Sequence, residues 1–249
     1  MSGHSKWASI KHQKGVTDAR RGQLFTKLTR ELIIAAREGG GSPDMNFRLR
    51  LAIQKARDSN MPMDNIDRAI KKGTGEIEGG SLVELTLEGY GPGGTAILVN
   101  ALSDNRNRTV QEIRNIFTRN GTNLGESGCV SWIFDSRGII TIKAEGVDAD
   151  ELALTAIDAG AEDVKVEDDY VEVYTTPDKF ETVRKTLEEQ GVNIETSEIS
   201  MVPKTTVELD EKTASQALKF MEKLEENDDV QNVFSNADFP DSVLESYRS

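Results

Sequence analysis

The chain has 249 residues, of which 37% are hydrophobic and 29% charged, and its formal net charge is −13. This composition is typical of a soluble globular protein long enough for one large domain or two to three small ones. The longest apolar run, Leu32 to Ala36, is far shorter than the ~18 residues of a membrane span, and the N-terminus lacks the apolar core of a signal peptide. We therefore expect a cytoplasmic protein without a membrane partner. Its single cysteine, Cys129, excludes an intramolecular disulfide and is interpreted as a buried structural thiol.

Charge is unevenly distributed along the chain. Residues 1–72 hold 15 Lys and Arg against 7 Asp and Glu, whereas the remaining 177 residues hold 15 against 36. An acidic protein can still bind a polyanion where Lys and Arg gather, because each neutralised phosphate releases condensed counterions. The N-terminal third is thus the predicted nucleic-acid-binding region.

The same third is predicted to be helical. Residues 1–22 have no sustained apolar period and are expected to form a mobile arm. An amphipathic helix starts near Leu24 and stops at the glycines 39–41. A second helix is expected after Pro43–Asp44, and a third from Pro62 to just before Gly73. Three short helices would make a small basic bundle.

Beyond a glycine-rich linker at 73–80, strands and helices alternate. The first part predicts strands at 82–88, 95–101 and 129–134, with a helix that begins at a capping box of Thr109 and Glu112. Residues 137–202 then follow the order strand, helix, strand, strand, helix, strand, which is the ferredoxin-like order. The tail adds a strand at 205–209, a helix around 214–224 and a strand at 230–234.

The two incomplete halves on either side of 137–202 are expected to close a second domain of the same type. The predicted fold class is α+β, with an N-terminal basic three-helix domain followed by two ferredoxin-like α/β domains, one inserted in the other. The expected boundaries are 1–79 for the arm and bundle, 80–136 with 203–249 for one ferredoxin-like domain, and 137–202 for the inserted one.

Side chains suited to catalysis or metal binding are scarce. Both histidines, His4 and His12, lie in the arm and far from Cys129, so no set of zinc ligands is available. A Ser-His-Asp arrangement would need its base on a rigid scaffold. The carboxylate pairs are interpreted as solvated helix faces and ends, namely Glu188–Glu189, Glu225–Glu226 and Asp228–Asp229. We expect no enzyme activity, no metal, no cofactor and no small-molecule substrate.

Two loops could bind an anion. Gly91-Pro92-Gly93-Gly94 lacks the Lys-Ser/Thr of a nucleotide-binding loop and indicates a hairpin turn between two strands. Arg106 and Arg108 stand just before the expected helix start, where guanidinium groups and the helix dipole together favour an anion. The alternative is a structural loop in which Asp104 pairs with these arginines, and the sequence weighs the two interpretations equally.

The arm and first helix interleave cations with aromatic rings. Such rings suit single-stranded or irregular nucleic acid, whose bases can stack on them. The alternative is a solvated basic tail in which Trp7 packs on the bundle. The candidate nucleic-acid-binding residues are Lys6, Trp7, Lys11, His12, Lys14, Arg20, Arg21, Lys27 and Arg30, together with Arg106 and Arg108.

Several of these segments form a recognisable set. They include Gly3-His4-Ser5-Lys6-Trp7, Arg20-Arg21-Gly22, Asn60-Met61-Pro62, Glu88 to Gly94, Ser103 to Thr109 and Gly160-Ala161-Glu162-Asp163. In these the chain resembles the YebC/PmpR family over essentially its full length. One departure is Phe47, where the family motif usually has Pro, and it affects the expected start of the second helix.

The resemblance implies three domains and a cytoplasmic, non-enzymatic regulator of gene expression, described in the family as a DNA-binding transcriptional regulator. A related mitochondrial member is a translational activator, so a ribosome-associated RNA-binding factor is the competing hypothesis. The residues themselves favour RNA or sequence-tolerant binding, since no helix-turn-helix recognition helix is evident. A protein-interaction scaffold would leave the basic arm unexplained.

Overall fold

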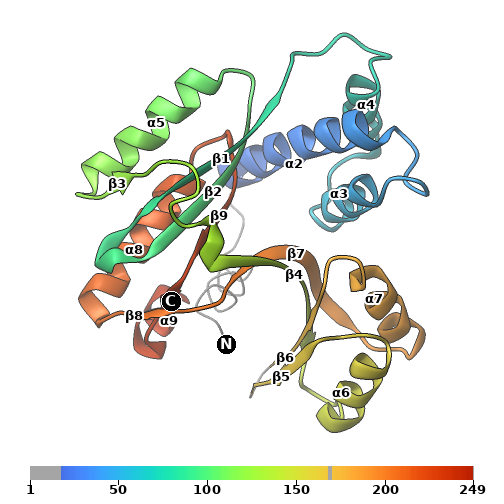
Figure 1. Cartoon of the computed structure of the whole chain (residues 1–249). Coiled ribbons are helices and arrows are strands. Elements are labelled where there is room, and N and C mark those ends of the chain that lie inside the picture. The colour runs from blue at the N-terminus through green and yellow to red at the C-terminus, as the bar shows by residue number, and fades with distance from the viewer. Residues whose placement is uncertain (1–17, 168–169, 249) are drawn as a thin grey trace.

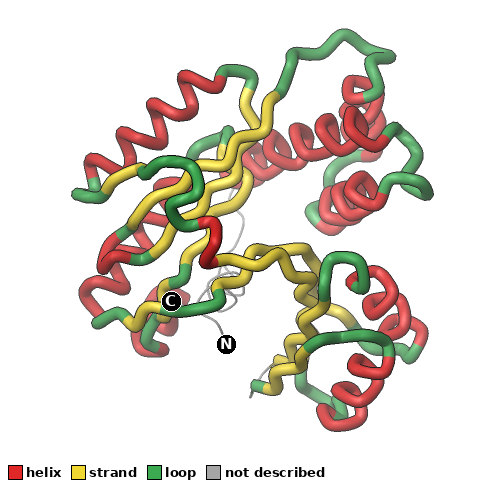
Figure 2. Tube along the Cα trace, in the orientation of Figure 1, coloured by secondary structure: helices red, strands yellow, loops and turns green. Residues whose placement is uncertain are grey.

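The computed structural model describes residues 18–167 and 170–248, apart from the side chains of 18–20, 247 and 248. Within this range the chain forms a helical part and two parts that each contain a four-stranded sheet (Figure 1). The α+β fold class predicted from the sequence is confirmed. Figure 2 shows helices in all three parts, with the two sheets joined by a pair of long strands.

Three helices make up the N-terminal part: α2 (Asp18–Gly39), α3 (Phe47–Asp58) and α4 (Met63–Gly73). Their apolar faces meet in one core that includes Leu32, Leu49 and Ile66. The entry into α3 is fixed by Asn46, whose side chain accepts from the N–H of Leu49 and donates to the carbonyls of Ala35 and Gly40 at 2.7 and 2.8 Å. This N-cap is why α3 begins cleanly without the expected proline.

The central sheet has the strand order β3-β1-β2-β9, and all its pairings are antiparallel. The strands are β1 (Val83–Tyr90), β2 (Ala96–Ser103), β3 (Asn123–Leu124) and β9 (Val230–Ser235). Two helices pack on one face of this sheet, α5 (Arg106–Arg119) and α8 (Glu211–Glu225), and Phe117 meets Phe220 edge to face at 4.9 Å. Gly93 and Gly94, both at positive φ, turn β1 into β2, so the predicted hairpin is present.

One predicted strand is shorter and lies elsewhere than expected, and another is absent. The segment expected as a strand at 205–209 contributes only β8 (Val207–Glu208), which pairs with β10 (Ala237–Asp238) in a separate parallel ladder. Its expected place in the central sheet is taken by β1, because the short hairpin turn lays β1 directly beside β2. The chain ends in a short helix, α9 (Asp241–Arg248).

The second correction concerns 129–134, which forms a turn of 3₁₀ helix at Ser131–Ile133 and not a strand. The cause is Glu88, a buried residue of β1. Its carboxylate accepts the backbone N–H groups of Gly128, Val130 and Ser131 at 2.7 to 2.9 Å. Burial alone would raise the pKa of Glu88, but these three hydrogen bonds outweigh it and hold the pKa below its usual value. The backbone groups that a strand would pair are thus bound to one side chain.

The inserted part contains six elements in the predicted order: β4 (Phe134–Lys143), α6 (Ala149–Asp158), β5 (Asp163–Val166), β6 (Tyr170–Thr175), α7 (Phe180–Glu189) and β7 (Ile194–Pro203). Its sheet order, β5-β6-β4-β7 with antiparallel neighbours, is that of a ferredoxin-like domain. Its core is its own, apart from contributions of Phe47 and Leu51 from α3. Phe47 meets Phe180 edge to face at 6.3 Å, so the residue that departs from the family motif joins two parts of the molecule.

We expect Glu88→Gln to lower the free energy of unfolding by about 1 to 3 kcal/mol, because the amide turns one acceptor into a donor that faces backbone N–H groups. Chemical denaturation at neutral pH measures this. Glu84→Gln is the control on the same strand: its ion pair with Arg48 is exposed, and its loss should cost about 0 to 1 kcal/mol. Equal effects of the two substitutions would contradict the role assigned to Glu88.

We expect residues 134–203 to fold as an independent unit, since they hold a complete sheet and all the fully buried residues of its core. Expressed alone, this segment should show a single cooperative thermal transition by circular dichroism. Phe180→Ala in the same segment should abolish or strongly lower that transition, because Phe180 is fully buried. A random-coil spectrum for the unsubstituted segment would refute the prediction.

Candidate nucleic-acid interface

The structure divides the residues predicted to bind nucleic acid into three groups. Five of them, Lys6, Trp7, Lys11, His12 and Lys14, lie outside the described residues, as does the side chain of Arg20. A second group, on α2, comprises Arg21, Lys27 and Arg30. The third group is Arg106 and Arg108, on α5.

Two cations of α2 point at the α/β part of the molecule. Lys27 donates through Nζ to the carbonyl of Glu225 at 2.5 Å, at the last residue of α8. Arg30 donates through one nitrogen to the carbonyls of Asp228 and Leu102 and to the carboxylate of Asp229. Cations at the carbonyl end of a helix are favoured by its dipole. These two side chains therefore hold α2 against the end of α8.

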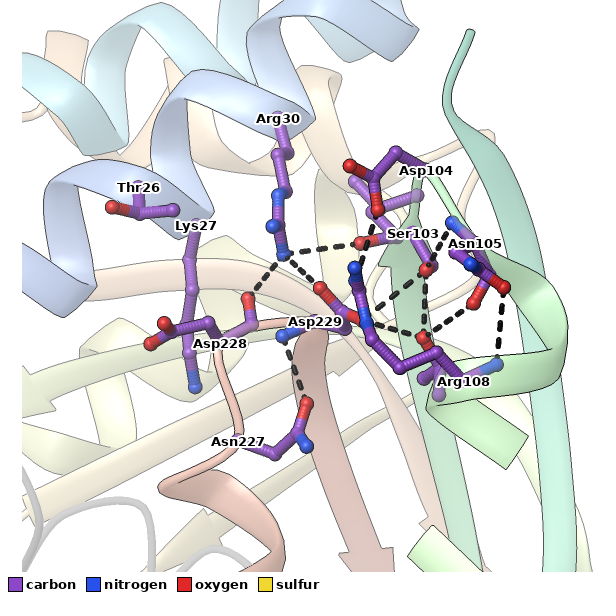
Figure 3. A network of polar contacts seen from close by, with 12 residues as sticks. Thr26, Lys27, Arg30, Ser103, Asp104, Asn105, Arg108, Asn227, Asp228 and Asp229 are labelled. Atoms are coloured by element: carbon purple, nitrogen blue, oxygen red, sulfur yellow. Dashed lines mark hydrogen bonds and ion pairs between the residues drawn. The ribbon is translucent and has the colours of Figure 1, made fainter. Parts of the chain in front are cut away.

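The centre of these contacts is Asp229, between α8 and β9 (Figure 3). Its carboxylate accepts from Arg30 at 2.7 Å, Arg108 at 2.7 Å, Thr109 at 2.5 Å and Ser103 at 3.1 Å. The side chain is only 4% exposed. We call Asp229 and these four donors the Asp229 network.

Electrostatics in the Asp229 network favour the ionised carboxylate. Burial alone would raise the pKa of Asp229, but the hydroxyl of Thr109 and the guanidinium groups of Arg108 and Arg30 outweigh it and hold the pKa below its usual value. The earlier interpretation of Asp228–Asp229 as a solvated pair is therefore wrong for Asp229. Its donors are distant in sequence, so no local signal could have identified it.

The start of α5 also differs from the sequence expectation. The N-cap is Asn105, whose side chain accepts from the N–H of Arg108, and not Thr109. Thr109 is buried within the first turn, where its hydroxyl donates to the carboxylate of Asp229. Both arginines consequently lie inside the helix.

Arg108 and Arg106 have different surroundings. For Arg108 the sequence left open an anion contact or a pairing with Asp104. The structure shows it bound to Asp104 at 2.9 Å and also to the buried carboxylate of Asp229. Its guanidinium is therefore part of the fold. Arg106 is exposed, and its side chain makes no hydrogen bond or ion pair within the described part of the chain.

Other cations of residues 1–72 are likewise either bound within the fold or exposed. Arg48 bridges Glu31, Glu38 and Glu84, which ties α2, α3 and β1 together. On α3 and α4 the exposed side chains of Arg57, Arg68 and Lys71 have no such partner among the residues described. These cations are available to a ligand.

The described residues contain no group of three or more His, Cys, Asp and Glu side chains placed to hold a metal ion. None of their helices is both long and apolar enough to cross a bilayer. What the fold does present is a basic helical part joined by ion pairs to two ferredoxin-like parts. These features define an α+β protein of three parts, one of them basic and helical.

Comparison with known proteins identifies the family. The model described as TACO1/YebC protein N-terminal domain matches residues 5–76, and the one described as TACO1/YebC second and third domain matches residues 82–237. The chain belongs to the TACO1/YebC family.

Relatives and a solved structure agree with this assignment. A protein of Dehalococcoides mccartyi is 61% identical over 100% of this chain and 99% of its own length, and one of Natranaerobius thermophilus is 53% identical over 99% and 100%. Both are named probable transcriptional regulatory protein. The crystal structure of a conserved hypothetical protein from Aquifex aeolicus is 49% identical, with a TM-score of 0.81 over 90% of this chain and 92% of that one.

We expect Asp229→Asn to lower the free energy of unfolding by about 2 to 4 kcal/mol at pH 7, because two guanidinium groups lose their shared anion. The pKa of Asp229 in the folded protein lies below the unfolded value of about 3.9. Its contribution is thus complete above about pH 4 and lost as the pH falls through the folded pKa. The difference in free energy of unfolding between wild type and variant should therefore shrink between about pH 4 and 2.

Urea unfolding at several pH values measures this gap. Asp228→Asn is the matched control, since the neighbouring carboxylate is exposed and Arg30 uses only the backbone carbonyl of that residue. If the difference in free energy of unfolding between wild type and Asp229→Asn stays constant down to pH 2, Asp229 is not ionised in the folded protein.

Proposed function

We propose that this protein regulates gene expression by binding nucleic acid directly, without a chemical step, in the cytoplasm. The observation that carries the proposal is the excess of cations in residues 1–72, part of which stays unpaired and exposed on α3 and α4. Arg57, Arg68 and Lys71 are such side chains, and phosphate contacts need no other chemistry. The basic arm before α2 adds further cations.

DNA is the ligand that the relatives' names suggest, since a transcriptional regulator acts on DNA. RNA is the second candidate, and a specific observation favours it. Trp7 and His12 stand among the lysines of the arm, and aromatic rings between cations stack well on unpaired bases. A ribosome-associated translation factor would need only this backbone and stacking recognition.

Neutralising the arm tests the proposal. In a variant with Lys6→Gln, Lys11→Gln and Lys14→Gln, we expect weaker binding to every DNA and RNA sequence tried, because phosphate contacts carry no sequence information. The slope of log affinity against log salt should flatten by about 0.7 to 0.9 per lost contact. Fluorescence anisotropy over a salt series on labelled DNA duplex, RNA duplex and single strands measures both quantities.

The control variant carries Lys143→Gln, Lys179→Gln and Lys185→Gln, which make the same charge change on the inserted part. It should bind like wild type. Wild-type protein that binds none of the probes would refute the proposed function, and an unchanged salt slope in the arm variant would remove the arm from it. Tighter binding to one DNA sequence favours the transcriptional role, whereas preference for RNA or ribosomes favours the translational one.

A further inference from the structure

Helices α5 and α8 form one continuous layer over the central sheet (Figure 1). Beyond the contact of Phe117 with Phe220, Lys223 donates to the side chain of Asn120 at 3.3 Å. Asn227, just after α8, donates to Glu112 at 2.9 Å. The outer sides of both helices consequently face the same direction, away from the sheet.

The outer side of α5 is mostly uncharged and polar. At 100° per residue, the side opposite the buried Ile113 and Phe117 carries amides, a hydroxyl and the carboxylate of Glu112, with the guanidinium of Arg114 at its edge. All of these side chains are exposed: Asn107, Gln111, Arg114, Asn115 and Thr118. Glu112 is exposed as well, and its carboxylate accepts from Asn227.

The outer side of α8 carries three lysines and an amide. Exposed residues at positions i, i+4, i+7 and i+11 lie on one stripe opposite the buried Leu218 and Met221. They are Lys212, Gln216, Lys219 and Lys223. Together with the outer residues of α5, this stripe defines what we call the helix-layer face.

Cations of the helix-layer face have few partners of their own. The side chains of Arg114 and Lys219 make no hydrogen bond or ion pair within residues 18–167 and 170–248, and the same holds for Arg106 and Arg119 at the two ends of α5. The ammonium group of Lys212 interacts electrostatically with the carboxylate of Asp210. Residues 73–249 carry 36 acidic against 15 basic side chains, yet Arg114 and Lys219 lie on this face without an ion pair to any described carboxylate. Such charge complementarity selects an anionic partner.

We infer that the helix-layer face docks on the sugar-phosphate backbone of double-helical RNA. The inference rests on the proposed nucleic-acid binding and adds a second contact surface to it. Lysine, arginine and amide side chains are the groups that contact phosphate and sugar. The unpaired cations neutralise phosphates, and amide groups such as Gln111 and Gln216 can both donate to a phosphate and accept from a hydroxyl.

The shape of the face favours RNA over DNA. Two packed helices, each about 10 to 12 Å across, are wider than the ~12 Å major groove of B-form DNA, which admits one helix. The minor groove of A-form RNA is wide and shallow and displays 2′-hydroxyl groups. Amides on a flat face can reach those hydroxyls, and only RNA has them.

The test uses the full-length protein and a 20-base-pair RNA duplex, with a DNA duplex of the same sequence and a second RNA sequence for comparison. In the variant Arg114→Gln, Lys212→Gln, Lys219→Gln we expect affinity for both RNA duplexes to fall at least about tenfold at one fixed salt. The salt slope should flatten by about 2 to 3, if each lost phosphate contact contributes ~0.9. Because these side chains are exposed, the melting temperature should move by less than about 2 °C.

Two matched variants complete the design. Lys143→Gln, Lys179→Gln, Lys185→Gln changes the charge equally on the inserted part and should leave RNA affinity within about threefold of wild type. Arg114→Lys, Lys212→Arg, Lys219→Arg keeps the charge of the face and should likewise retain affinity. Loss of RNA binding in the Gln variant alone supports the inference.

Each other outcome overturns it. If the Gln variant binds RNA like wild type while the arm variant is weakened, the helix-layer face is not a contact surface and the proposed function stands. If the control variant loses as much affinity as the Gln variant, only total charge matters. If DNA binding falls as much as RNA binding, the assignment to RNA is wrong. Wild-type protein that binds no duplex or single strand refutes the inference and the proposed function together.

Discussion

The position of the helical part depends on one buried carboxylate. Asp229 lies between α8 and β9, and it accepts hydrogen bonds from side chains of α2, β2 and α5. Burying an unpaired carboxylate would cost several kcal/mol, so the arrangement is stable only when these donors arrive together. A single side chain thereby couples the position of α2 to the first turn of α5.

The number of cations in residues 1–72 overstates how many can contact a phosphate. Arg30, Lys27 and Arg48 contribute to the excess of cations in residues 1–72, yet each is bound to carbonyl or carboxylate oxygens of another element. Charges used in this way hold domains together and are not free to neutralise phosphate. The excess that remains for a ligand lies in exposed side chains such as Arg57 and Arg68.

Net charge is equally misleading for the α/β parts. Helical periodicity gathers cations and amides on the outer side of α5 and α8, where Glu112 is the acid of α5. A segment with a strongly negative total can thus offer a face that attracts a polyanion, because screening at physiological salt confines each charge to about 8 Å.

By itself, the sequence determined the elements whose signals are local. Apolar periodicity placed α2, α3, α4 and α8, and the alternating order of 137–202 placed a complete ferredoxin-like sheet. Tertiary structure alone decided the rest, because the deciding partners are remote. Asp229 is 199 residues from Arg30 and 121 from Arg108, and Glu88 reaches across 42 residues to make a turn where periodicity indicated a strand. A side chain that satisfies distant backbone or charge outweighs local propensity, since an unpaired buried group costs more than a preferred conformation gains.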